Sequence, residues 1–234
     1  MHALLLLMFV SALLLSGCQT ITPLTKASSF PHMYDQQRPV TILMLPPINK
    51  TTAADAKELY ATTVAEPVTQ HGYYLFPPAV VFDLFRQDGI DDTETMINTP
   101  PRVFGQKFGA DAILIVELTE WNTAYYILGG HVSVGFNMKL VSTHTGETIW
   151  ERDTLQIVDT SGGNNSGGGL AGLLVKAVMA ALQTSATDYI PIARQANQVA
   201  LHALPHGKYH PRYNVDKNDE FLPITRPTTL GTSK

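Results

Sequence analysis

The most clearly defined strand of the chain is predicted over Asp111-Ala112-Ile113-Leu114-Ile115-Val116-Glu117-Leu118, and the other elements are placed around it. Its apolar run is continuous rather than alternating, which is typical of a strand buried on both faces of a sheet. Downstream, residues 132–141 alternate, and Thr145-Gly146 then predicts a turn into a partner strand over 148–158. The apolar side of the alternating run comprises Val132, Val134, Phe136, Met138 and Leu140. These two strands should form an antiparallel hairpin with one buried face.

Upstream of the quoted strand, the chain is expected to alternate between strands and helices. The predicted elements are strands over 40–45 and 73–76 and helices over 53–70, 79–87 and 101–108. This order predicts parallel strands joined by helical crossovers. We therefore expect an α/β sandwich of two or three layers, with a mixed sheet whose antiparallel hairpin lies at the edge. C-terminal helices over 170–189 and 191–204 complete a single domain that spans residues 39–204.

The N-terminus has the pattern of an exported lipoprotein. Residues 3–15 are apolar but shorter than the run of about 20 residues that spans a membrane. Leu15-Ser16-Gly17-Cys18 follows, an apolar residue and two small residues before a cysteine. This lipobox pattern predicts that residues 1–17 are removed as a signal peptide and that Cys18, the one cysteine of the chain, is lipidated. An ordinary signal peptide with an unrelated cysteine is the alternative, and Met1-His2 lacks the usual Lys or Arg.

Composition indicates the surroundings of the domain. Residues 18–38 have no apolar period and predict a lipidated tether, while residues 205–234 predict a polar tail that is extended or disordered. Gln19 after the cysteine favours the outer membrane, by resemblance to enterobacterial sorting, with the body in the periplasm or at the cell surface. The chain has 16 Lys and Arg residues, no basic run and a formal net charge of −4, which argues against a nucleic-acid partner.

Three motifs suggest chemistry, but their context argues against it. Gly167-Gly168-Gly169-Leu170-Ala171-Gly172 has the spacing of a dinucleotide-binding loop, yet it lies late in the chain and not after the first strand. Asp159-Thr160-Ser161-Gly162 is similar to an aspartic-protease turn, with one residue too many and no second copy. His202, His206 and His210 are four residues apart, but a proline and a glycine interrupt any helix there, so a solvated tail is expected. The sequence predicts no catalytic residue, no cofactor, no metal and no enzyme activity.

Residues 170–182 leave two interpretations open. The segment is almost wholly apolar, with Lys176 as its one charge. It is either a helix buried in the core or a helix whose exposed apolar face serves self-association or membrane contact. The candidate interaction residues are Leu170, Leu173, Leu174, Ala177, Val178 and Ala181. The second interpretation predicts a homo-oligomer.

Five segments, taken in order, resemble a family of bacterial lipoproteins of undefined function, typified by a neisserial surface-antigen lipoprotein. They are residues 15–18, 42–49, 108–114 and 145–150 and the glycine-rich entry to Leu170. The second and third segments are also similar to curli-secretion and penicillin-binding-protein-activator lipoproteins. The resemblance implies an α/β sandwich that acts as a non-catalytic scaffold or accessory in an envelope assembly, by binding other envelope proteins in transport or secretion. A carrier of a small apolar ligand, held between the sheet and residues 170–182, is the alternative.

Overall fold

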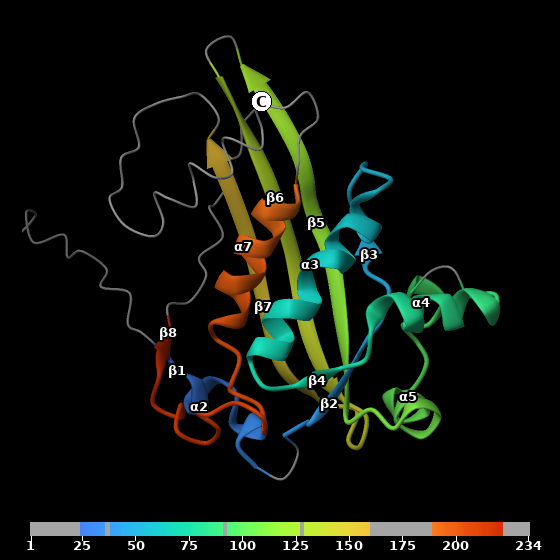
Figure 1. Ribbon diagram of the computed structural model, residues 1–234, viewed down its shortest axis with the longest axis vertical. Coiled ribbons are helices and arrows are strands. Elements are labelled where there is room, and N and C mark those ends of the chain that lie inside the picture. The colour runs from blue at the N-terminus through green and yellow to red at the C-terminus, as the bar shows by residue number, and fades with distance from the viewer. Residues whose placement is uncertain (1–23, 36–37, 91–92, 127–128, 160–188, 222–234) are drawn as a thin grey trace, which may run out of the picture.

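The computed structural model describes residues 24–35, 38–90, 93–126, 129–159 and 189–221, and its centre is a mixed sheet of six strands (Figure 1). The strands are β2 (Thr41–Met44), β3 (Ile48–Asn49), β4 (Tyr74–Leu75), β5 (Ala112–Tyr126), β6 (Gly129–Ser142) and β7 (Thr148–Asp159). Their order is β4-β2-β5-β6-β7, and β3 pairs with β5 beyond the end of β2. β2 pairs in parallel with β4 and with β5, and β3 pairs in parallel with β5. The β5–β6 and β6–β7 pairs are antiparallel. The predicted mixed sheet with an antiparallel hairpin at its edge is confirmed.

The two longest strands extend further than predicted. β5 continues past Leu118 to Tyr126, and β6 begins at Gly129, upstream of its predicted start. A register shift between Leu118 and Glu120 places one extra residue in β5, which is a β-bulge. The bulge brings Trp121 to the buried side of the strand. It also breaks the two-residue period, so the pattern gives no sign that the strand continues.

Four helices lie where the sequence predicts them, and they cover the sheet unequally. They are α3 (Ala56–Gln70), α4 (Pro78–Gln87), α5 (Pro101–Phe108) and α7 (Ile190–Leu201). α3 and α7 lie side by side on one face, where Tyr60 and Ala196 join the core around Phe136. On the other face, Phe85 of α4 and Phe104 of α5 pack with Leu43 and neighbouring residues of the parallel strands. The described body therefore has three layers over its parallel half and two over its antiparallel half.

The segments that carry the family resemblance have clear structural roles. Pro46 and Pro47 separate β2 from β3, because proline has no N–H to donate to the sheet. Gly109 ends α5 in the left-handed conformation, with a φ of 72°. The Asp111 carboxylate then accepts hydrogen bonds from the amides of Val40 and Thr41, both at 2.9 Å, and joins the start of β5 to the start of β2.

The predicted tether and tail are wrong for the residues nearest the domain. Residues 24–33 form β1 (Leu24–Thr25), α2 (Lys26–Ser29) and the 3-10 helix η1 (Pro31–Met33), and β8 (Glu220–Phe221) lies near the C-terminus. β1 pairs antiparallel with β8. Met33 and Phe221 are buried. Elements of two to four residues are too short to show an apolar period, so the folded body extends beyond both predicted limits, 39 and 204.

Several predictions concern residues outside the described ranges. These are the signal peptide, Cys18, the glycine-rich loop and the helix with Leu170, Leu173, Leu174, Ala177, Val178 and Ala181. Among the described residues, no helix combines the length and the apolar character that crossing a membrane requires.

Candidate functional site

The two ends of the described chain meet at the lower end of the molecule in Figure 1, which we name the base (residues 24–35, Arg38 and residues 202–221). At its centre the Lys26 ammonium lies 3.5 Å from a carboxylate oxygen of Asp216, and these side chains are only 3% and 0% exposed. Lys26 also donates to the carbonyl of Leu204 at 3.0 Å, and Asp216 accepts the amide of His206 at 2.7 Å. A buried ion pair thus connects the N-terminal segment to the C-terminal one.

Burial acts against both charges of this pair. It lowers the pKa of Lys26, and the carboxylates of Asp216 and Asp219 offset part of that effect. Burial would raise the pKa of Asp216, but the His206 amide and the Lys26 ammonium outweigh it and hold that pKa below its usual value. A charge in such a place is tolerated only with a partner, so each member of the pair requires the other.

Arg38 also connects the N-terminal and C-terminal segments of the base. Its guanidinium lies between the rings of Tyr34 and Tyr213, at 4.4 and 4.8 Å from their centroids. It also donates to the side-chain oxygen of Asn214 at 2.8 Å. The β1–β8 pairing, the Lys26–Asp216 ion pair and the contacts of Arg38 together form what we name the clasp.

The histidines at four-residue spacing form a ring stack instead of a solvated series. His206 and His210 stack with their centroids 3.7 Å apart, and His71, at the end of α3, lies 5.5 Å from His206. Both stacked rings are half-buried, so the predicted solvated tail is wrong for them, whereas His202 is exposed. The described residues contain no group of His, Cys, Asp or Glu side chains placed to hold a metal ion.

Two glycines let the C-terminal segment approach α3 under this stack. A Cβ on Gly207 would overlap the carbonyl of Gly72, and a Cβ on Gly72 would overlap His210. Gly72 also has a φ of +83°, which favours glycine. Burial lowers the pKa of His206 to about 4, and the charges of Lys26 and His210 act in the same direction. The packing therefore favours a neutral His206.

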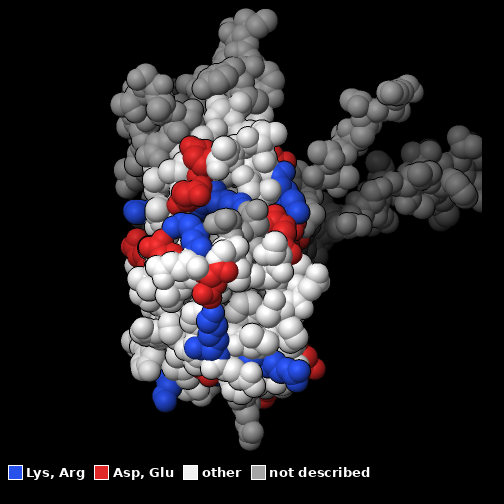
Figure 2. All heavy atoms as spheres, turned by 90° about the vertical axis from the view of Figure 1, so that its right-hand side faces the viewer, with Lys and Arg blue, Asp and Glu red and all other residues white. Residues whose placement is uncertain are grey.

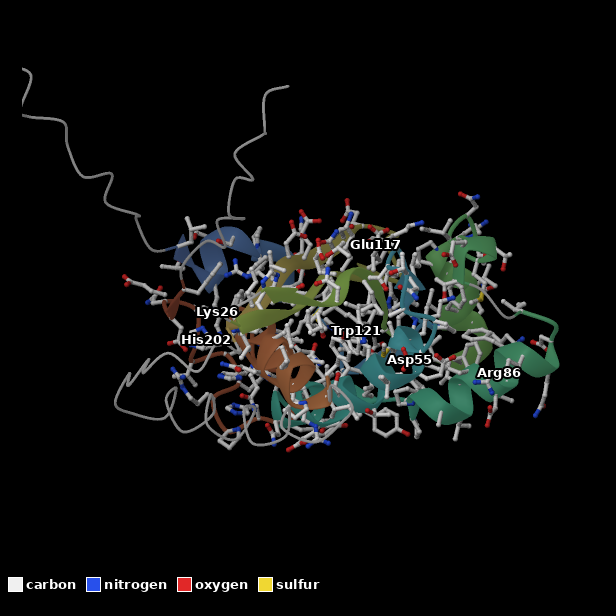
Figure 3. The ribbon with its side chains drawn as sticks, turned by 90° about the horizontal axis from the view of Figure 1, so that it is seen from above. Lys26, Asp55, Arg86, Glu117, Trp121 and His202 are labelled. Carbon is white, nitrogen blue, oxygen red and sulfur yellow. The ribbon has the colours of Figure 1, made fainter. Side chains whose placement is uncertain are left out.

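A second candidate surface is the face of β5, β6 and β7 opposite α3 and α7. The paired side chains on it are Glu117, Asn137 and Asp153, then Glu120, Gly135 and Leu155, then Asn122, Ser133 and Ile157. We name these three rows the open face, because no described helix buries them and Ile157 is 49% exposed. Figure 3 shows Glu117 on the side of the sheet away from α3 and α7. Ser133 donates to Asn122 at 2.6 Å and Asn122 to Glu120 at 2.8 Å, which fixes these polar side chains.

A small crevice opens beyond the ends of β2 and β4, between α3 and α4. It is lined by Pro46, Pro47, Lys57, Glu58, Phe82, Arg86 and Ile90, and its volume is about 60 Å³. Ligands of α/β sheets often bind at such carboxyl ends. However, ligand pockets usually measure roughly 300 to 1,000 Å³. Figure 2 also shows charges of both signs interspersed on this side of the molecule. This crevice is therefore not suited to a cofactor.

The fold and the two surfaces define a class: a mixed α/β domain with one open sheet face, whose chain ends are fastened together at its base. The chain belongs to the family described as "Putative lipoprotein GNA1162-like", whose model matches residues 32–209. "Putative lipoprotein NMB1124/NMB1162" of Neisseria meningitidis serogroup B (strain ATCC BAA-335 / MC58) is 33% identical over 185 residues, which are 79% of this chain and 83% of the relative. The predicted family is confirmed.

A solved structure of the same family agrees with this assignment. The crystal structure of lipoprotein GNA1162 from Neisseria meningitidis matches with a TM-score of 0.51 and 33% identity, and covers 63% of this chain and 100% of that one. The PelC dodecamer from Paraburkholderia phytofirmans is more distant, with a TM-score of 0.40 and 14% identity over 70% of this chain and 88% of that one. A likeness at that level says nothing about function.

Sequence reasoning missed the residues of the clasp. Lys26 and Asp216 lie in segments without an apolar period, so no local pattern marks them. One signal was available: Tyr209, Tyr213 and Phe221 place three aromatic residues in the predicted tail, and disordered segments are poor in aromatic residues.

Proposed function

We propose that this protein is lipidated on Cys18, anchored in the outer membrane, and acts as a non-catalytic scaffold or accessory of an envelope assembly. Membership of a lipoprotein family and the Leu15-Ser16-Gly17-Cys18 pattern support the anchor. The body lies in the periplasm or at the cell surface. Its proposed partners are other envelope proteins and further copies of this chain.

The observation that carries the binding role is the open face. It combines polar side chains with the apolar Leu155 and Ile157, a mixture typical of interfaces that form between separately folded proteins. The hydrogen bonds from Ser133 to Asn122 and from Asn122 to Glu120 hold its polar groups in place. Little conformational entropy is then lost when a partner binds there.

Self-association is proposed through the apolar segment 170–182. Leu170, Leu173, Leu174, Ala177, Val178 and Ala181 fall on one side of a helix in the sequence pattern. Small residues such as Ala177 and Ala181 allow two helices to approach closely.

The anchor is tested by comparing the wild-type protein with Cys18→Ser in cells. We expect the mature wild-type protein to carry the mass of diacylglycerol on Cys18 and to sediment with outer membranes. Cys18→Ser should lose both properties. A wild-type protein with an unmodified Cys18 thiol would contradict the proposal.

The binding role is tested with a photo-crosslinking amino acid at Asn137 on the open face. The matched control carries the same group at Gln87, an exposed position on α4. We expect crosslinks to another envelope protein from position 137 and not from position 87. Equal crosslinking at the two positions, or adducts of this chain with itself alone, would exclude the open face as the site for an accessory partner.

A further inference from the structure

The described body begins very close to the proposed lipid site. Five residues, Gln19 to Pro23, separate Cys18 from Leu24. An extended chain spans about 3.5 Å per residue, so Leu24 lies within about 20 Å of Cys18 whatever path the chain takes between them.

The clasp keeps this connection short. Leu24 is held opposite Phe221 by the β1–β8 pairing, and Lys26 is held by Asp216. If Thr41 at the start of β2 were the first fixed residue, the chain from Cys18 could extend over roughly 80 Å and would impose no orientation on the body. Because the clasp exists, the base is the part of the domain that must stay near the membrane.

The base also carries the two most exposed large apolar side chains in the described residues. Val215 is 68% exposed and Tyr209 is 66% exposed, and the exposed Tyr213 lies between them in the sequence. The amide of Ala27 donates to the carbonyl of Lys217 at 3.0 Å, so this loop lies beside the segment that leads to Cys18. Large apolar side chains are unfavourable in water, and their free energy falls when a neighbouring surface removes them from it.

We propose that the base is a membrane-contact surface, where Tyr209, Tyr213 and Val215 enter the interfacial zone of the bilayer that holds the lipid on Cys18. Tyrosine is enriched in this zone, because its ring is apolar and its hydroxyl is polar. The exposed Lys208 and Lys217 flank these residues in the sequence, and cations close to a membrane surface are attracted to lipid phosphates. The proposal rests on the lipidation of Cys18. In this orientation the end of β5 and the start of β6, at the opposite end of the sheet in Figure 1, lie away from the membrane.

The test uses the lipidated mature protein in vesicles of phosphatidylethanolamine and phosphatidylglycerol that contain a nitroxide-labelled phosphatidylcholine. Val215→Cys receives an environment-sensitive fluorophore, and Ile157→Cys on β7 is the matched control, since both positions are exposed and apolar. We expect a blue-shifted emission and loss of most of the fluorescence at position 215, with neither change at position 157. Equal quenching at both positions, or none at position 215, would overturn the proposal.

Two further measurements separate the possible failures. Cys18 is the one native cysteine, so the fluorophore labels the wild-type protein only if that thiol is not acylated; such labelling would refute the anchor itself. With the anchor established, a label on Lys208→Cys should lose its quenching when Tyr209→Ser and Val215→Ser are added. Unchanged quenching at position 208 would mean that these side chains do not hold the base on the bilayer, and would refute the contact while leaving the anchor intact.

Discussion

The sheet and the clasp hold one chain together by opposite means. In the sheet, apolar side chains such as Leu114, Phe136 and Trp150 belong to one large core, where each contact is supported by many others. In the clasp, the contacts that join two distant segments include a buried ion pair, an arginine against two rings and a strand pair of two residues. Apolar burial grows with area, whereas the ion pair depends on both charges being present.

The two kinds of contact determine which part of the molecule opens first. Removing one contact from the sheet weakens a cooperative unit, so the loss appears in the unfolding of the whole domain. The clasp depends on paired polar groups and lies at the ends of the described chain, so we expect it to open by a local reaction while the sheet remains folded. Single polar substitutions and changes of pH should therefore act first on the clasp.

The largest effect is expected in the sheet, from Phe136→Ala. Phe136 is fully buried, and its ring packs edge-on against Tyr60 at 5.0 Å. Removing the ring leaves a cavity and should lower the free energy of unfolding by about 3 to 5 kcal/mol. Urea denaturation followed by tryptophan fluorescence measures this loss. Ile157→Ala, at an exposed position of β7, is the control and should change stability by less than about 0.5 kcal/mol.

Asp216→Ala should open the clasp without unfolding the sheet. It leaves the Lys26 ammonium buried without its partner, which costs about 3 kcal/mol. We expect faster amide exchange and new protease cleavage in residues 24–35, with unchanged exchange in β5 and β6. Lys26→Met combined with Asp216→Leu removes both charges and should restore protection. Faster exchange in β5 and β6 of the single variant would show that the clasp and the sheet unfold together.

The same contrast explains what the sequence could predict. In the strand over 111–118 and the alternating run over 132–141, the order of apolar residues within the segment itself shows which faces are buried. The mixed sheet and its helices were therefore predictable. The bulge after Leu118 and the pairing of Lys26 with Asp216 depend on contacts across the fold, which no local period records. The lipidation of Cys18 and the role of residues 170–182 stay predictions, because those residues lie outside the described ranges.

A polar network inside the apolar core is intermediate between the sheet and the clasp, because it joins two helices by hydrogen bonds within the core. The Tyr60 hydroxyl donates to the side-chain oxygen of Asn197 at 2.8 Å, and the Asn197 amide donates to the Thr63 hydroxyl at 2.9 Å. These buried groups join α3 to α7. Asn197→Ala leaves the Tyr60 hydroxyl without its acceptor and should cost about 1 to 3 kcal/mol. Denaturation against the control Gln198→Ala, an exposed neighbour, measures it. A loss confined to amide exchange in α7 would mean that this helix behaves like the clasp.

Acid should weaken the packing of residues 202–221 in the base while the sheet stays folded. Packing lowers the pKa of His206 from its ordinary value of 6.5 to about 4, and burial also lowers the pKa of His71. The unfolded segment therefore takes up a proton before the folded one as the pH falls. The stability that a neutral His206 gives is present above about pH 6.5 and is lost as the pH falls from there to about 4.

The ordinary pKa of Asp216 is 3.8 and the fold lowers it further, so loss of its charge acts only below that range. We expect the packing of residues 202–221 to lose about 1 to 2 kcal/mol between pH 7 and pH 4, because one pKa unit corresponds to about 1.4 kcal/mol and solvent screens part of the effect at half-exposed rings. Amide exchange in residues 202–221, corrected for its intrinsic pH dependence, measures this loss, with β5 as the internal reference. His206→Gln should flatten the dependence, since glutamine does not titrate. An equally steep loss in that variant would assign the acid response to groups outside the histidine stack.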